Sequence, residues 1–201
     1  MIAPDAALAP NLVSLTRPVL GVLLAGSLQS GSSPAALPLV LAACLSDYVD
    51  GRLARRAGLE RFSGRLIDNF CDATFLALAF WAMGEARLWA PAGGWLGSRW
   101  VWVNGLPLLA FASAFTAYLA RMLIERLRGI APARSRLGHA AGIANYGLAI
   151  AGAVEAIPSL TLWPGFREPG FVAIAALNLA AVAENLGLVF PARRNEPTMR
   201  P

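Results

Sequence analysis

Six apolar segments dominate the sequence and constrain its fold more than any other feature. They run over about 11–28, 34–50, 65–86, 100–126, 138–157 and 170–190. A helix that spans a bilayer needs about 20 predominantly apolar residues, because its backbone polar groups must be satisfied within the segment. The sequence therefore predicts an all-α integral membrane protein, with six transmembrane helices in a single domain over residues 1–201.

The composition supports this class and excludes others. Of the 201 residues, 57% are hydrophobic and 14% are charged, whereas soluble domains carry about 25% charged residues. A soluble nucleic-acid-binding protein can share the net charge of +5 but would be less apolar, so no nucleic-acid partner is expected. One histidine, His139, and two isolated cysteines also form neither a histidine metal centre nor a disulfide framework.

The arginines predict the orientation of the helices. Segments 51–65 and 121–136 are rich in arginine, and so is the C-terminal tail, whereas the loops between them in sequence hold only Arg87, Arg99 and Arg167. Basic residues are enriched in cytoplasmic loops. With six spans, all arginine-rich segments and both termini fall on one side, which we expect to be the cytoplasmic side of a bacterial inner membrane.

Four aspartates lie where the second and third apolar segments approach each other, at positions 47, 50, 68 and 72. Residues three or four apart share a helix face, so two antiparallel helices can direct two carboxylates each at one point. An unpaired Asp at a helix centre costs about 2.5–3.5 kcal/mol. Four facing carboxylates favour a hard divalent cation, Mg²⁺, Mn²⁺ or Ca²⁺, together with a phosphate-bearing substrate. The alternative is a hydrated loop, which the helical spacing and the apolar neighbours disfavour.

The pattern D-x-x-D-G-x-x-A-R-x8-G-x-x-x-D-x-x-x-D resembles the signature of CDP-alcohol phosphatidyltransferases. The chain fills all eight fixed positions: Asp47, Asp50, Gly51, Ala54, Arg55, Gly64, Asp68 and Asp72. The first apolar segment also opens on PNLVSLTR, which is similar to the family's P-N-x-x-T-x-x-R, with Ser14 in place of threonine. The resemblance implies a six-helix membrane protein that forms a homodimer.

The resemblance further implies a mechanism. Two Mg²⁺ (or Mn²⁺) ions held by the four aspartates would grip the pyrophosphate of a CDP-linked donor, most often CDP-diacylglycerol. Asp72 would be the general base on the acceptor hydroxyl, and CMP would leave. The donor pocket would be lined by Asn11, Ser14, Arg17, Gly51, Ala54, Arg55 and Gly64.

The acceptor is predicted from the arginines near the fourth and fifth helices. Arginine binds phosphate through paired hydrogen bonds, which favours glycerol 3-phosphate, then inositol phosphate, over a neutral alcohol. The candidates are Arg121, Arg136 and His139, although arginines here also fit ordinary cytoplasmic charge. Members that use glycerol phosphate tend to open the fifth helix with G-K-x-x-T, and the chain departs from this pattern at His139 and Gly142.

Two further interpretations stay open from the sequence. The aspartates could form the permeation site of a divalent-cation channel or transporter, but transporter sites usually lie near the bilayer midplane, and Arg55 would have no role there. Asn145, Glu184 and Asn185 are polar at membrane depth, which marks them as functional candidates. They could instead pair with one another or form a dimer contact.

Overall fold

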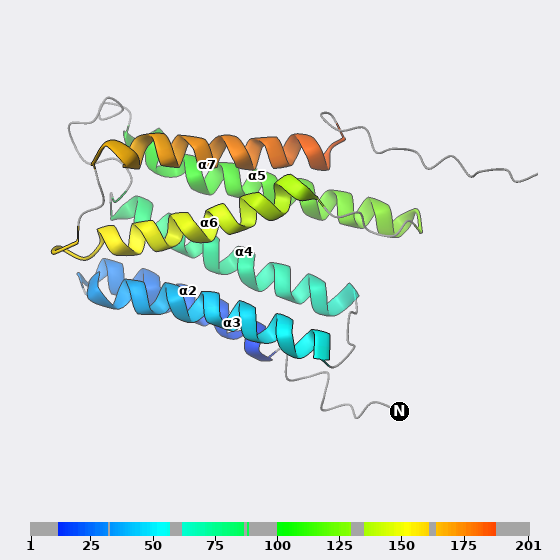
Figure 1. The fold of residues 1–201 in the computed structure, drawn as a ribbon, viewed down its shortest axis with the longest axis horizontal. Helices are drawn as coiled ribbons and strands as arrows, with labels where there is room; N and C mark the ends of the chain where they lie inside the picture. Colours follow the sequence, from blue (N-terminus) through cyan, green and yellow to red (C-terminus); the bar gives the residue numbers. More distant parts are fainter. Residues whose placement is uncertain are drawn as a thin grey trace, which may run out of the picture.

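The computed structural model describes residues 12–31, 33–56, 62–86, 88, 100–129, 135–160 and 164–187. Over these ranges the protein is helical and contains no strand, which confirms the all-α prediction. The long helices, labelled in Figure 1, are α2 (Thr16–Gln29), α3 (Ala36–Arg56), α4 (Phe62–Glu85), α5 (Trp100–Leu127), α6 (Arg136–Glu155) and α7 (Pro164–Asn185), with a short 3₁₀ turn, η1 (Ser33–Ala35), before α3.

Several helix boundaries differ from the sequence expectation, those near the aspartates and those of α7 (Pro164–Asn185, against about 170–190) among them. Helix α3 continues to Arg56 rather than ending near residue 50, and α4 already begins at Phe62. The extension of α3 is rich in arginine, so apolar length alone did not reveal it. All four aspartates lie within helices, as the spacing predicts, Asp47 and Asp50 on α3 and Asp68 and Asp72 on α4.

Four of the described helical segments are long and apolar enough to cross a membrane: Leu12–Gln29, Gly64–Glu85, Gly105–Leu127 and Arg136–Glu155. The segment Pro169–Asn185 is apolar but shorter. Helix α3 carries aspartates and arginines in its second half, which lowers its hydropathy. The chain is therefore an apolar, multi-helix protein suited to a membrane, and six crossings with both termini on the cytoplasmic side stay predictions.

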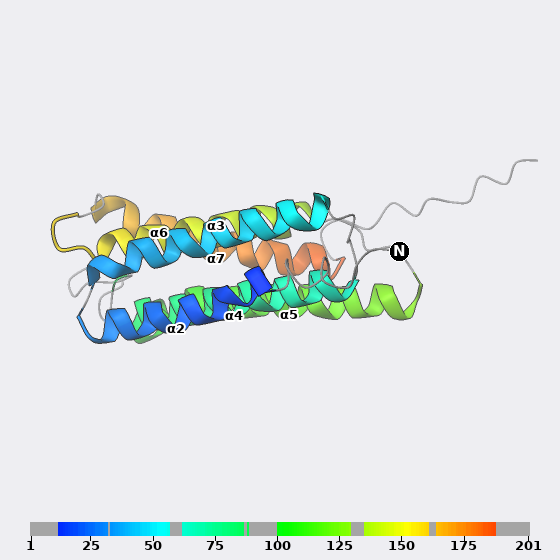
Figure 2. The same ribbon diagram turned by 90° about the horizontal axis from the view of Figure 1, so that it is seen from below.

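The helices lie roughly side by side in two layers. In Figure 2, α2, α4 and α5 form one layer, α3 and α6 lie in the other, and α7 lies between them. Helix α2 packs chiefly on α4 and α3, while α7 packs on α5 and α6. The C-terminal end of α3, the start of α4, the last turns of α5 and α7 and the first turn of α6 lie toward the same end of the bundle (Figure 1).

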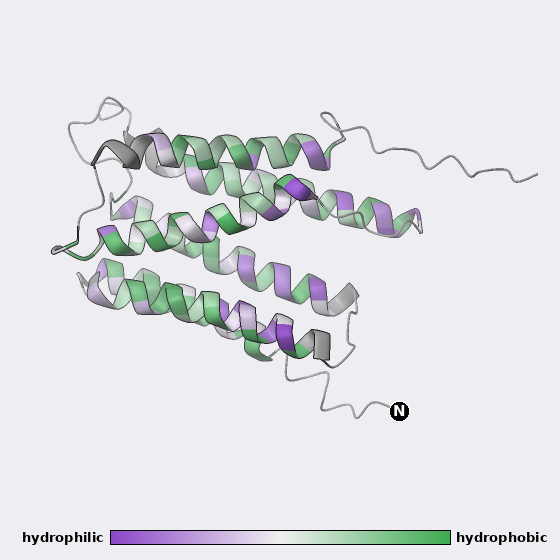
Figure 3. Cartoon of the chain, viewed as in Figure 1, coloured by the Kyte–Doolittle hydropathy of each residue, from purple (hydrophilic) through white to green (hydrophobic). Residues whose placement is uncertain are grey.

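The packed interior draws apolar side chains from every long helix, including Leu24, Val40, Phe75, Phe111, Leu148 and Phe171. Many other large apolar side chains are exposed, among them Leu23, Leu45, Leu109, Ile143 and Leu179. Large contiguous apolar patches are rare on soluble monomers, so these outer faces suit contact with lipid. Figure 3 shows hydrophilic residues gathered toward the end of the bundle where α3 finishes and α4 begins.

Gly21 allows α2 to lie close to α4. A Cβ atom at this position would lie 3.3 Å from the Cα of Phe75 and 3.0 Å from Cδ1 of Leu78. Because residues four apart share a helix face, Arg17 lies on the same side of α2, one turn earlier. The close approach therefore places Arg17 against the part of α4 that carries Asp68 and Asp72.

Candidate active site

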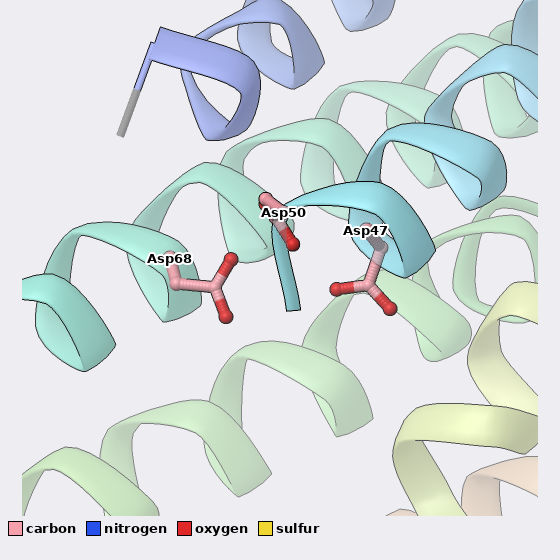
Figure 4. A group of neighbouring side chains, drawn as sticks. All are labelled: Asp47, Asp50 and Asp68. Carbon is pink, nitrogen blue, oxygen red and sulfur yellow. The ribbon is translucent and has the colours of Figure 1, made fainter. Parts of the chain in front are cut away.

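The aspartates of α3 and α4 converge at the polar end of the bundle. Carboxylate oxygens of Asp47, Asp50 and Asp68 lie within 4.8 Å of one another, and Figure 4 shows these three side chains coming from the two helices. Asp50 is buried, whereas the side chain of Asp47 is 46% exposed. The cluster thus has a closed side, toward the protein interior, and an open side, toward the surroundings.

Arg17 of α2 lies among all four carboxylates and is itself fully buried. Its Nη1 contacts Asp72 and lies 3.4 Å from Asp47 Oδ1. Its Nη2 contacts Asp50 and lies 2.5 Å from Asp68 Oδ1. A single guanidinium from a third helix therefore joins the two carboxylate pairs, a contact that the sequence analysis did not predict for this residue.

The other predicted donor-pocket residues surround the same place where the structure describes them. Ser14 is buried and donates to Asp50 Oδ2 at 2.7 Å and to Asp68 Oδ1 at 3.4 Å. Gly51 follows Asp50 in α3, and Gly64 lies one turn before Asp68 in α4. Asn11 lies outside the described residues. Ala54 and Arg55 belong to α3, but their side chains are outside the description as well.

Tyr146 of α6 is a site residue that the sequence analysis missed. Its hydroxyl donates to Asp72 Oδ1 at 2.5 Å, and its ring stacks on Phe75 with centroids 6.0 Å apart. The only signal in the sequence was a phenol within an apolar segment, next to Asn145, which was singled out instead. Asp72 Oδ1 thus accepts hydrogen bonds from two helices, from Arg17 on α2 and from Tyr146 on α6.

The donor set of the cluster fits a hard divalent cation. All ligand atoms are carboxylate oxygens, the type that Mg²⁺, Mn²⁺ and Ca²⁺ prefer over nitrogen or sulfur. The four carboxylates also already surround a positive charge, the guanidinium of Arg17. The arrangement is therefore suited to hold cationic charge, and binding of a metal ion by these aspartates stays a prediction.

The predicted acceptor residues occupy the ends of α5 and α6. Arg121 is half-buried, with Nε 2.9 Å from Glu125 Oε1 and Nη1 3.4 Å from Asn185 Oδ1. Arg136 and His139 are exposed at the start of α6. One turn before Arg121, the Tyr118 hydroxyl accepts a 2.8 Å hydrogen bond from Asn69, the neighbour of Asp68. Helix α5 is thereby joined to the aspartate-bearing part of α4.

The remaining polar residues join α6 to α7. Glu184 accepts hydrogen bonds from the backbone N–H groups of Arg136 and Leu137, at 3.1 and 2.9 Å, and from the Ser135 hydroxyl. It therefore caps the first turn of α6 from the end of α7. Asn145 forms a reciprocal amide pair with Asn178, at 3.0 and 2.8 Å, and both are buried. These contacts fix the position of α6, which carries Tyr146.

Comparison with known proteins places these residues in a family. A model of the CDP-alcohol phosphatidyltransferase family matches residues 7–184. No curated protein and no solved structure shows significant similarity to the chain. Members of this family are divalent-metal-dependent phosphotransferases that use a CDP-alcohol donor and an alcohol acceptor in phospholipid synthesis. The match covers the first-helix motif, all four aspartates and Tyr146, and the chain belongs to the CDP-alcohol phosphatidyltransferase family.

Proposed function

We propose that the protein transfers a phosphatidyl group from CDP-diacylglycerol to the hydroxyl of a small polar alcohol and releases CMP. The observation that carries this proposal is the convergence of four carboxylates, from α3 and α4, around one position already filled by positive charge. Transfer at phosphorus depends mainly on positioning and on neutralising the charge of the phosphates. A cluster that concentrates cations beside a pyrophosphate meets that requirement.

Asp47, Asp50, Asp68 and Asp72 would hold two Mg²⁺ or Mn²⁺ ions in this proposal. When bound, such ions neutralise phosphate oxygens and stabilise the leaving CMP. Ser14 and Arg17 would contact the donor beside the aspartates, as would Gly51 and Gly64, whose lack of side chains permits close approach. Asn11, Ala54 and Arg55 are proposed for the same pocket from the family pattern.

Asp72 is the proposed general base. Tyr146 donates to its Oδ1, so Oδ2 is the oxygen that we expect to receive the proton of the acceptor hydroxyl. The resulting alkoxide oxygen forms a bond to the phosphorus that bears the diacylglycerol. The bond between that phosphorus and the bridging oxygen breaks, and the electron pair leaves with CMP.

Glycerol 3-phosphate is the proposed acceptor, with inositol phosphate second, so the chain would resemble a phosphatidylglycerophosphate synthase. The proposal is supported by Arg121, toward the end of α5, and by Arg136 and His139, at the start of α6. These helix ends lie toward the same end of the bundle as the end of α3 and the start of α4 (Figure 1). Because Arg121 is paired with Glu125, an acceptor phosphate would have to share or replace that carboxylate. We further propose that the protein acts as a homodimer in a bacterial inner membrane, with the site facing the cytoplasm.

The test is CMP release by purified protein with CDP-diacylglycerol, Mg²⁺ and a panel of alcohols, including glycerol 3-phosphate, inositol phosphate and neutral alcohols. Asp72→Asn should lower release about 10²–10⁴-fold, the range for loss of a general base. Glu85→Gln is the matched control, because Glu85 is an exposed acid at the opposite end of the same helix. Equal losses in the two variants would refute the assignment of Asp72.

The alternative function, a divalent-cation channel or transporter, predicts a different result when the same purified protein is assayed. Such a protein would release no CMP with any acceptor but would move Mg²⁺ across liposomes. Among the described residues, no feature favours this function.

A further inference from the structure

The position of Arg17 raises a conflict within the proposed metal site. Its two terminal nitrogens contact the carboxylate oxygens Asp50 Oδ2, Asp68 Oδ1 and Asp72 Oδ1. These oxygens are among those that a bound metal ion would use. The guanidinium lies between α3 and α4 and has no exposed surface, so it occupies the centre of the cluster rather than its rim.

Geometry and charge make joint occupancy of that centre unfavourable. Mg²⁺ requires oxygen ligands at about 2.0–2.1 Å in a near-octahedral arrangement. An ion at that distance from Asp50 and Asp68 would lie against the Nη2 group that already contacts both. The guanidinium and the metal ion would then repel each other at close range. Because the backbone of α2 is packed on α4, we expect the Arg17 side chain, rather than the whole helix, to move away.

The charge of the cluster favours divalent metal ions over the guanidinium of Arg17. Arg17 supplies one positive charge to four carboxylates, which leaves the cluster with net negative charge. Divalent ions neutralise it more fully, and they do so most effectively where water is excluded. Within the described part of the chain, the buried Nε of Arg17 also has no hydrogen-bond partner, so its present position leaves one donor unsatisfied.

We propose that Arg17 is a built-in counter-cation that competes with divalent metal for the aspartate cluster and is displaced when metal binds. This inference rests on the proposed function, because it assumes that the cluster is the metal site. Once displaced, the guanidinium offers a fork of donors, including the unpartnered Nε, that matches a phosphate group. Metal binding would thereby convert Arg17 from a partner of carboxylates into a ligand for the phosphates of the donor.

The test is calorimetric titration of Mg²⁺ into purified protein without donor or acceptor. If Arg17 competes, the apparent dissociation constant of the wild type is higher than the intrinsic one. It equals the intrinsic constant divided by the fraction of molecules in which Arg17 does not block the cluster. We expect Arg17→Gln to bind Mg²⁺ at least about fivefold more tightly than the wild type. Equal or weaker binding by Arg17→Gln would overturn the proposal, since it would mean that Arg17 organises the site without competing.

Arg52→Gln is the matched control for loss of positive charge nearby. Arg52 lies two residues after Asp50, is exposed and donates to the Tyr48 hydroxyl at 2.9 Å. Because salt screens exposed charges, this variant should change the dissociation constant less than about twofold. A tightening as large as that of Arg17→Gln would show a general charge effect and would also overturn the proposal.

Two further outcomes keep the result interpretable. If Arg17→Gln does not fold, Arg17→Lys replaces it: the ammonium keeps the charge but lacks the fork that reaches four carboxylates, so Mg²⁺ should still bind more tightly than to the wild type. Unchanged or weaker binding by Arg17→Lys counts against displacement. If the wild type binds no Mg²⁺, the metal site of the proposed function fails as well.

Discussion

Replacing Tyr146 with phenylalanine removes one hydroxyl from the candidate site and little else. The ring keeps its place, because it stacks on Phe75 at an interplanar angle of 15°. What is lost is the 2.5 Å hydrogen bond to Asp72 Oδ1. If Asp72 takes the acceptor proton through Oδ2, that bond fixes the orientation of the carboxylate during transfer. Tyr146 is then a positioning residue, and its loss should lower the rate of CMP release.

The expected size follows from the kind of hydrogen bond. A bond to a charged group contributes about 1.5–3 kcal/mol, and each 1.36 kcal/mol in activation free energy is tenfold in rate. Tyr146→Phe should therefore lower kcat by about 10–150-fold. KM for CDP-diacylglycerol should change less than kcat, because Asp72 itself remains in place as one of the four aspartates that would hold the metal ions.

The assay is steady-state CMP release in detergent or in liposomes, with kcat and KM determined separately. Tyr118→Phe is the matched control, because it also removes a partly buried tyrosine hydroxyl. That hydroxyl accepts a 2.8 Å hydrogen bond from Asn69, which lies on the same helix as Asp72. This bond is between neutral groups and does not reach Asp72, so the control should stay within about threefold of the wild type.

Two results would refute the reasoning about Tyr146. One is a Tyr146→Phe enzyme whose kcat is that of the wild type while Asp72→Asn is inactive, because the hydrogen bond would then have no part in positioning the base. The other is an equal loss in Tyr146→Phe and Tyr118→Phe. That result would indicate a general disturbance of packing around α4.

Two further predictions concern how α6 is held. Asn145→Leu leaves buried Asn178 without its reciprocal partner and should lower the free energy of unfolding by about 1–3 kcal/mol. The measurement is thermal unfolding in detergent. A smaller loss in the double variant Asn145→Leu, Asn178→Leu would confirm the pairing, and an unchanged single variant would contradict it. Glu184→Ala removes the acceptor that caps α6 and should weaken its first turn by about 0.5–2 kcal/mol. Amide exchange over residues 135–140 should then accelerate while α2 is unaffected, and uniform acceleration would contradict a local role.

Local spacing was sufficient to predict much of this molecule. Apolar length gave the helices, and intervals of three and four residues placed Asp47 with Asp50 and Asp68 with Asp72 on common faces. Both features depend on residues within one or two turns of each other. The motif match then identified the family, which the family model confirmed over residues 7–184.

Contacts between distant segments were not accessible in the same way. Arg17 lies 51 and 55 residues before Asp68 and Asp72, and periodicity does not tell which neighbouring helix its side chain meets. Tyr146 lies 74 residues after Asp72, in a helix that is apolar on most sides, so no single face was marked as inward. Glu184 was recognised as unusual, but its partners are backbone N–H groups, which no sequence pattern reveals.

The close approach at Gly21 links the packing of two helices to the charge of the site. A methyl group there would meet Leu78 Cδ1 at 3.0 Å and Phe75 Cα at 3.3 Å, contacts that require neighbouring atoms to give by a few tenths of an ångström. Arg17 lies one turn before Gly21 on α2, so any outward shift of this helix would carry Arg17 away from Asp68 and Asp72. The separation of two helices, set by a residue with no polar side chain, would then govern how strongly the cluster attracts external cations.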